Sequence, residues 1–199
     1  MTCDPEIPGK TLYEVLRDTA AGNPGSPAYS FAGIRETYGD LLEQVNSLSL
    51  RMAASGTGKG DFVMICLPNC PQAIIAVYAA SRLGAVAVMT HPMSSRDEIA
   101  FFIRDGNCKT AFILDSLAPD LPAGSGLENV ILIPSGKDVP SVPGAVTWED
   151  FLKMPAGDRE MPEVSPYDPA CVMYTGGTTG TSKGAVLSSM NFNASALGM

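Results

Sequence analysis

The chain has 199 residues, of which 45% are hydrophobic and 17% charged, and its formal net charge is −8. This composition is typical of a globular protein with a buried core and excludes a disordered or collagen-like chain. The acidic balance and the lack of a basic run argue against nucleic acid as a partner. No segment is long and apolar enough to predict a membrane span, and the first residues lack the pattern of a secretory signal.

The five cysteines predict free thiols. Cys66 and Cys171 lie in apolar runs, where a thiol packs as a small hydrophobic side chain. No Cys-x-x-Cys pair occurs and His91 is the single histidine, so the ligand spacing of a zinc site is missing. We therefore expect a reducing, cytoplasmic compartment.

Two helices are predicted in the first 60 residues. The first covers 11–21 and begins at Thr11 and Glu14, which have the spacing of a capping box. The second covers 38–55, where apolar side chains recur at helical spacing. A glycine-rich segment follows each of them and predicts its end.

Short segments of strand character are predicted between and after these helices. Residues 28–31 and 34–37 alternate in polarity around Gly33 and predict a hairpin. Apolar strands then alternate with helices, which is typical of a parallel sheet with helices on its faces. The predicted order is strand 61–67, helix 72–83, strand 85–89, helix 94–105, strand 109–114 and strand 130–133. The fold class predicted is α/β, with a mainly parallel sheet flanked by helices.

The segment 134–166 is rich in proline and shows little periodicity, so we interpret it as an irregular connector over the surface. Only 147–154 predicts a short helix there. Trp148 is interpreted as a side chain that fills an apolar gap, with stacking against a ligand as the alternative.

Several polar residues are interpreted as structural. His91 precedes a proline after a strand and is expected in a turn, and Asp168 is expected in a turn as well. Adjacent acidic pairs fall at predicted helix starts, where the helix dipole favours negative charge. These pairs are Asp97 with Glu98 and Glu149 with Asp150.

The segment with the clearest chemistry runs from 170 to 199. A predicted strand over 170–174 leads into a loop of small residues, a second strand over 185–187 follows, and a helix begins near 190. The loop combines glycines that let backbone N–H groups approach a phosphate, hydroxyl groups, and a single cation. The glycines are Gly176, Gly177, Gly180 and Gly184, the hydroxyls belong to Thr175, Thr178, Thr179, Thr181 and Ser182, and the cation is Lys183.

This loop departs from the two commonest nucleotide motifs. It is not a Walker A loop, because Lys183 is preceded by Ser182 and followed by Gly184, and it is not Gly-x-Gly-x-x-Gly. Taken by composition alone, a flexible turn rich in small residues is an alternative interpretation.

The spacing from Tyr174 to Gly184 resembles the phosphate-loop signature of the adenylate-forming superfamily, usually Tyr-Thr-Ser-Gly-Thr-Thr-Gly-x-Pro-Lys-Gly. Gly176 stands where that signature has serine and Ser182 where it has proline. The superfamily includes acyl-CoA synthetases, aryl-CoA ligases, luciferases and peptide-synthetase adenylation domains. Further segments resemble it in the same order along the chain: Thr37-Tyr-Gly-Asp-Leu-Leu42, Gly60-Asp-Phe-Val63, Leu67-Pro-Asn69, Arg82-Leu-Gly-Ala85, His91-Pro92 and Ser188–Asn191.

The resemblance implies the partial N-terminal AMP-binding domain of an acyl-CoA synthetase-like fold over 1–199, without the C-terminal lid domain. It implies activation of a carboxylic acid, fatty or aryl, by ATP and Mg²⁺ to an acyl-adenylate, followed by transfer to coenzyme A. Thr175, Thr178, Thr179 and Lys183 would contact the phosphates, and the glycines would shape the loop.

Two expectations follow from the missing later motifs of the superfamily. The 199 residues alone should catalyse nothing, and residues from Tyr174 onward should be mobile or packed abnormally. No residue of this segment is assigned as a catalytic group or a metal ligand. The alternative function is a non-catalytic nucleotide- or protein-binding module with a degenerate loop.

Overall fold

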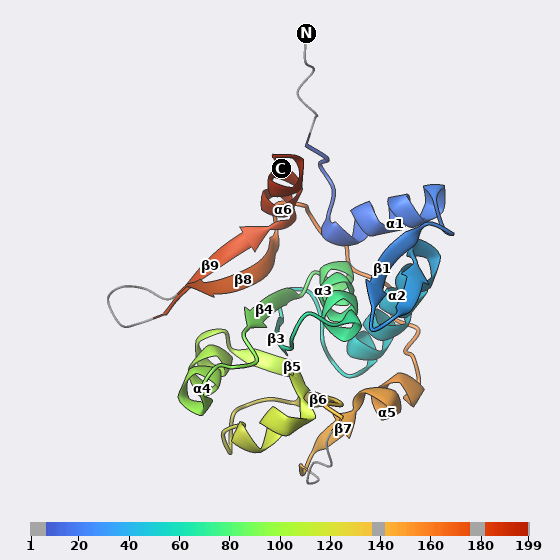
Figure 1. Cartoon of the computed structure of the whole chain (residues 1–199). Helices are drawn as coiled ribbons and strands as arrows, with labels where there is room; N and C mark the ends of the chain where they lie inside the picture. Colours follow the sequence, from blue (N-terminus) through green and yellow to red (C-terminus); the bar gives the residue numbers. More distant parts are fainter. Residues whose placement is uncertain (1–6, 137–141, 176–181, 199) are drawn as a thin grey trace.

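The computed structural model describes residues 7–136, 142–175 and 182–198. Its centre is a seven-stranded sheet with the order β7-β6-β5-β3-β4-β8-β9, in which only β9 is antiparallel to its neighbour (Figure 1). A separate two-stranded hairpin, β1–β2, lies beside the helices near the N-terminus. The predicted α/β class with a mainly parallel sheet is confirmed.

The N-terminal helices begin at side-chain caps. α1 (Leu12–Gly22) and α2 (Tyr38–Ala54) each follow a threonine in a capping box, which satisfies backbone N–H groups of the first turn. Between them, β1 (Pro27–Phe31) and β2 (Ile34–Thr37) pair antiparallel. The two linking residues, Ala32 and Gly33, have φ of 49° and 85°, which is typical of the tight turn of a two-residue hairpin.

The remaining elements follow the predicted order closely, with two additions. The elements are β3 (Phe62–Cys66), α3 (Pro71–Leu83), β4 (Val86–Thr90), α4 (Arg96–Asp105), β5 (Cys108–Leu114), the 3₁₀ helix η1 (Asp115–Asp120), β6 (Asn129–Ile133), β7 (Ala145–Thr147), α5 (Trp148–Lys153), β8 (Pro169–Thr175), β9 (Lys183–Ser188) and α6 (Ser189–Leu197). The additions are η1 and β7. The segment predicted as an irregular connector therefore contains an edge strand, whose three residues are too few to show alternation.

Two apolar layers cover the two faces of the sheet. Alternate residues of β3 separate between them: Val63 and Ile65 pack with α1, α2, α3 and α5, whereas Met64 and Cys66 pack with α4 and η1. This period of two is expected for a strand buried on both faces. Because the strands from β3 to β8 are parallel, their carboxyl ends meet at one edge, where ligands bind in open α/β sheets.

Candidate functional site

The predicted phosphate loop joins β8 to β9 at the carboxyl edge of the sheet. β8 runs parallel to β4, with Ala87 opposite Cys171 and Met89 opposite Met173, so the end of β8 lies on the same side as the end of β4. β9 returns antiparallel along β8 as the outer strand (Figure 1). The predicted strand–loop–strand arrangement is therefore present in the described residues on both sides of the loop.

The base of the loop is formed by a pair of residues from the two strands. Thr175 lies opposite Lys183, and the Thr175 hydroxyl donates a 3.4 Å hydrogen bond to the Lys183 carbonyl. The next pair inward is Tyr174 with Gly184, and Ser182 precedes Lys183 on the other side. The remaining predicted loop residues, 176–181, lie outside the described residues, and their roles stay predictions.

Gly184 has a packing role at this base. A Cβ built on it would lie 2.9 Å from Val172 Cγ1 and 3.3 Å from Tyr174 Cε1. Both separations are shorter than a comfortable carbon–carbon contact of about 3.5–4.0 Å. Only glycine lets β9 pass over these two side chains at this spacing.

Tyr174 connects the base of the loop to α4. Its hydroxyl donates a 2.7 Å hydrogen bond to Asp105 Oδ2, and its ring lies 4.2 Å from the Phe102 ring and 6.0 Å from the Phe101 ring, between centroids. Burial of the phenol, followed by the bond to the Asp105 carboxylate, raises the pKa of Tyr174 above its ordinary value. The sequence gives no signal for this contact, because its partners lie 69 residues apart.

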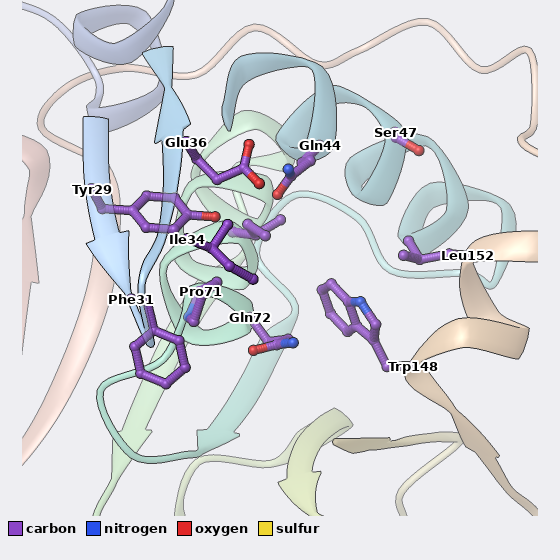
Figure 2. A pocket seen from close by; sticks show the side chains of 11 residues that line it. Tyr29, Phe31, Ile34, Glu36, Gln44, Ser47, Pro71, Gln72, Trp148 and Leu152 are labelled. Carbon is purple, nitrogen blue, oxygen red and sulfur yellow. The ribbon is translucent and has the colours of Figure 1, made fainter. Parts of the chain in front are cut away.

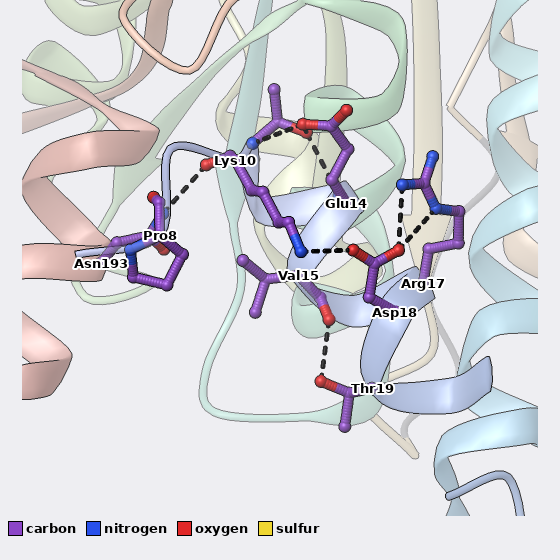
Figure 3. Close-up of polar contacts among 9 residues, drawn as sticks. Pro8, Lys10, Glu14, Val15, Arg17, Asp18, Thr19 and Asn193 are labelled. Carbon is purple, nitrogen blue, oxygen red and sulfur yellow. Dashed lines mark hydrogen bonds and ion pairs between the residues drawn. The ribbon is translucent and has the colours of Figure 1, made fainter. Parts of the chain in front are cut away.

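The far end of the hairpin is held by α6 against the N-terminal segment. Asn193 Nδ2 donates hydrogen bonds of 2.9 Å to the carbonyls of Pro8 and Lys10, as Figure 3 shows. The Leu12 N–H donates a 3.2 Å bond to Ser189 Oγ. These bonds fix the helix that follows β9 to the start of α1. The mobility predicted for residues from Tyr174 onward stays a prediction.

Comparisons with known proteins find similarity over most of the chain. A family model described as AMP-binding enzyme matches residues 16–199. The chain belongs to the AMP-binding enzyme family. A long-chain-fatty-acid–CoA ligase of Bacillus subtilis is 33% identical over 213 aligned positions, which include 94% of this chain and 38% of that protein.

Solved structures of two CoA ligases share the fold. An anthranilate CoA ligase in complex with anthranoyl-AMP superposes with a TM-score of 0.82 at 18% identity, covering 97% of this chain and 37% of that one. A putative long-chain-fatty-acid CoA ligase from Rhodopseudomonas palustris gives 0.78 at 26% identity, covering 96% and 47%. The chain thus spans less than half the length of each of these proteins.

The described ends of the loop fit the phosphates of the nucleotide expected in an AMP-binding enzyme. Thr175 and Ser182 supply hydroxyls and Lys183 supplies an ammonium group, and all three lie at the loop end of the hairpin. None of the ion pairs between described residues uses Lys183. Several donors and a cation, with no carboxylate among these residues, are the partners that a polyphosphate requires.

Trp148 belongs to a different region. It is 9% exposed and packs edge-to-face on Phe112, with centroids 6.0 Å apart. It also lines one end of a cavity of about 410 Å³, opposite Tyr29 and Glu36 of the β1–β2 hairpin (Figure 2). No residue of β8 or β9 lines this cavity. The burial of Trp148 supports its interpretation as a packing side chain.

The other polar residues take structural positions. His91 Nδ1 accepts a hydrogen bond from the Met93 N–H in a turn, and Glu98 closes the capping box of α4. Asp168 pairs with Lys59 at 2.9 Å, and this bond lowers the pKa of the Asp168 carboxyl. Within 7–136, 142–175 and 182–198, no three metal-ligating side chains converge and no helix has the length and apolar character to cross a bilayer.

Proposed function

We propose that the protein containing this chain activates a carboxylic acid with ATP and Mg²⁺, giving an acyl-adenylate and pyrophosphate, and then transfers the acyl group to coenzyme A. The observation that carries the proposal is the β8–β9 hairpin. It presents Thr175, Ser182 and Lys183 at the carboxyl edge of the parallel sheet in a chain of the AMP-binding family.

The residues of the hairpin have distinct roles in this proposal. The Lys183 ammonium offsets negative charge on the outer phosphates, which matters because the chain as a whole carries −8. Ser182 donates a hydroxyl hydrogen bond, and the Thr175 hydroxyl donates one once it turns away from the Lys183 carbonyl that it contacts at 3.4 Å. Thr178 and Thr179 are predicted to add two more. Bound ATP supplies the adenylyl group and a pyrophosphate leaving group, and Mg²⁺ accompanies its phosphates.

The substrate is proposed to be a fatty or aryl acid. The Bacillus subtilis relative acts, by its name, on long-chain fatty acids, and the anthranilate CoA ligase on an aryl acid. The chain spans 38% of the first of these, so the reaction is proposed for the whole protein, and the 199 residues alone are expected to form no acyl-adenylate. We place the protein in the cytoplasm, which the four buried free cysteines Cys66, Cys70, Cys108 and Cys171 support.

The test is formation of hydroxamates from acids by the protein that contains this chain, with hydroxylamine trapping the adenylate. Short, medium and long fatty acids and aryl acids are screened with and without ATP. An ATP-dependent product that is lost in Lys183→Ala supports the proposal and identifies the acid. A folded protein that binds ATP but yields no product from any acid would favour the non-catalytic binding module, with Gly176 and Ser182 as the departures to examine.

A further inference from the structure

We propose that Tyr174 and Asp105 are positioning residues that fix Thr175 and Lys183, the base of the phosphate loop, against α4; the proposal rests on the phosphate-binding role given above. The loop follows Thr175, one residue after Tyr174. What holds Tyr174 therefore determines where the loop begins.

The pairing of β8 with the parallel sheet ends before the loop begins. The pairing of β8 with β4 stops at Met89 opposite Met173. Tyr174 and Thr175 extend past this point, and among the described strands they pair only with β9, which is itself an outer strand. The end of the hairpin thus projects beyond the parallel sheet, and backbone hydrogen bonds to β4 do not hold it.

The Tyr174 side chain supplies the missing connection. Residues of a strand alternate between faces, so Tyr174 lies on the same face as Val172, toward α4. Its ring packs at 4.2 Å on Phe102 and its hydroxyl donates a 2.7 Å bond to the Asp105 carboxylate. A bond to an ionised acceptor is stronger than one between neutral groups.

Both strands of the hairpin share this anchor. Gly184 lies opposite Tyr174, and its missing side chain leaves room for the tyrosine ring beneath β9. Movement of the ring away from α4 would therefore displace Thr175 on one strand and Lys183, beside Gly184, on the other. These two residues carry the described hydroxyl and ammonium groups of the loop base.

The experiment compares Tyr174→Phe, Asp105→Ala and the double variant in the protein that contains this chain. The phenylalanine keeps the ring packing and removes only the hydroxyl. Tyr13→Phe is the matched control, because the Tyr13 hydroxyl donates a 2.9 Å bond to Asn46 Oδ1 in another part of the fold. Dissociation constants for Mg²⁺·ATP are measured by calorimetry, hydrogen exchange of the β8 and β9 peptides by mass spectrometry, and the melting temperature for each variant.

Each single variant is expected to weaken ATP binding about tenfold, the lower end of the range for a hydrogen bond to a charged group. The double variant should lose no more than either single one, because both remove the same bond. Exchange of the β8 and β9 peptides should rise. Tyr13→Phe should lower the melting temperature without changing either the ATP affinity or the hydrogen exchange of the hairpin. Asp105→Asn keeps an acceptor oxygen and should therefore bind ATP more tightly than Asp105→Ala, with most of the wild-type affinity.

Two results would overturn the positioning role: unchanged hairpin exchange in Tyr174→Phe, or additive losses in the double variant. Failure of the proposed function looks different. A wild-type protein that binds no ATP contradicts the phosphate-binding role, while the exchange comparison still decides whether the pair holds the hairpin.

Discussion

Replacing Gly184 with alanine tests how closely the two strands of the hairpin pack. The added Cβ would meet Val172 Cγ1 at 2.9 Å and Tyr174 Cε1 at 3.3 Å. Val172 is 5% exposed and packs in the layer beneath α4, so it has little room to turn away. The strain must be relieved by movement of β9 or of the Tyr174 ring, and both change the base of the loop.

The expected cost follows from overpacking, which typically lowers the free energy of unfolding by about 1–3 kcal/mol. A matched control is Gly25→Ala, because a Cβ at Gly25 meets no atom within 4 Å. Both substitutions reduce the freedom of the unfolded chain, an effect that stabilises by about 0.4–1 kcal/mol and is common to the two variants. The difference between them should therefore report the clash alone, at about 1–3 kcal/mol.

The assay is urea unfolding followed by the fluorescence of Trp148, the single tryptophan of the chain. Gly25→Ala should unfold at a slightly higher urea concentration than the wild type, and Gly184→Ala at a lower one with the same slope. Equal midpoints for the two alanine variants would refute the packing argument.

Four further predictions concern the core, the thiols, the pH dependence and the hairpin. Leu48 is fully buried, so Leu48→Ala should lower the free energy of unfolding by about 2–5 kcal/mol in the same assay, and a loss below about 1 kcal/mol would contradict its place in the core. Burial raises the pKa of Cys108 to about 12 and of Cys171 to about 11, so a disulfide reagent at about pH 8 should modify them only after denaturation, and rapid labelling of the folded chain would argue against this burial. Hydrogen bonds from the capping serine of α4 lower the pKa of the Glu98 carboxyl, so at this group the folded state binds fewer protons than the unfolded state. The contribution of Glu98 to stability should therefore be constant above about pH 5 and fall below about pH 4, whereas a rise in acid would reverse the assigned direction. Hydrogen exchange in the described residues from Tyr174 onward, 174–175 and 182–198, is expected to be faster than in the central strands, and equal protection would contradict the predicted mobility.

Much of the fold is predictable because its signals are local. The capping box at Thr11 and Glu14 depends on residues three apart, and the structure contains it with a 3.1 Å bond from the Glu14 N–H to Thr11 Oγ1. The central strand β3 is a continuous apolar run, so its burial on both faces is visible in the sequence. The strand β7 shows the opposite case: three residues carry too little pattern, and its place is set by pairing with β6.

The same distinction applies to the candidate site. The loop and its lysine are visible as a continuous segment, and the structure places Thr175, Ser182, Lys183 and Gly184 at its two ends. The anchor between Tyr174 and α4 is not visible in this way, since it depends on a contact that only the folded sheet creates. Local motifs thus predict the chemistry of the site, and tertiary contacts decide how it is held.

The most direct test of the central claim is calorimetric titration of the protein that contains this chain with Mg²⁺·ATP, using Lys183→Ala and Lys153→Ala. Lys153 is an exposed lysine of α5, whose ammonium pairs with Asp150, and it controls for the loss of one positive charge. The phosphate-loop account predicts binding by the wild type and by Lys153→Ala, and a loss of about tenfold or more in Lys183→Ala, as expected for one charge-assisted contact. Equal affinity of the two lysine variants would contradict it.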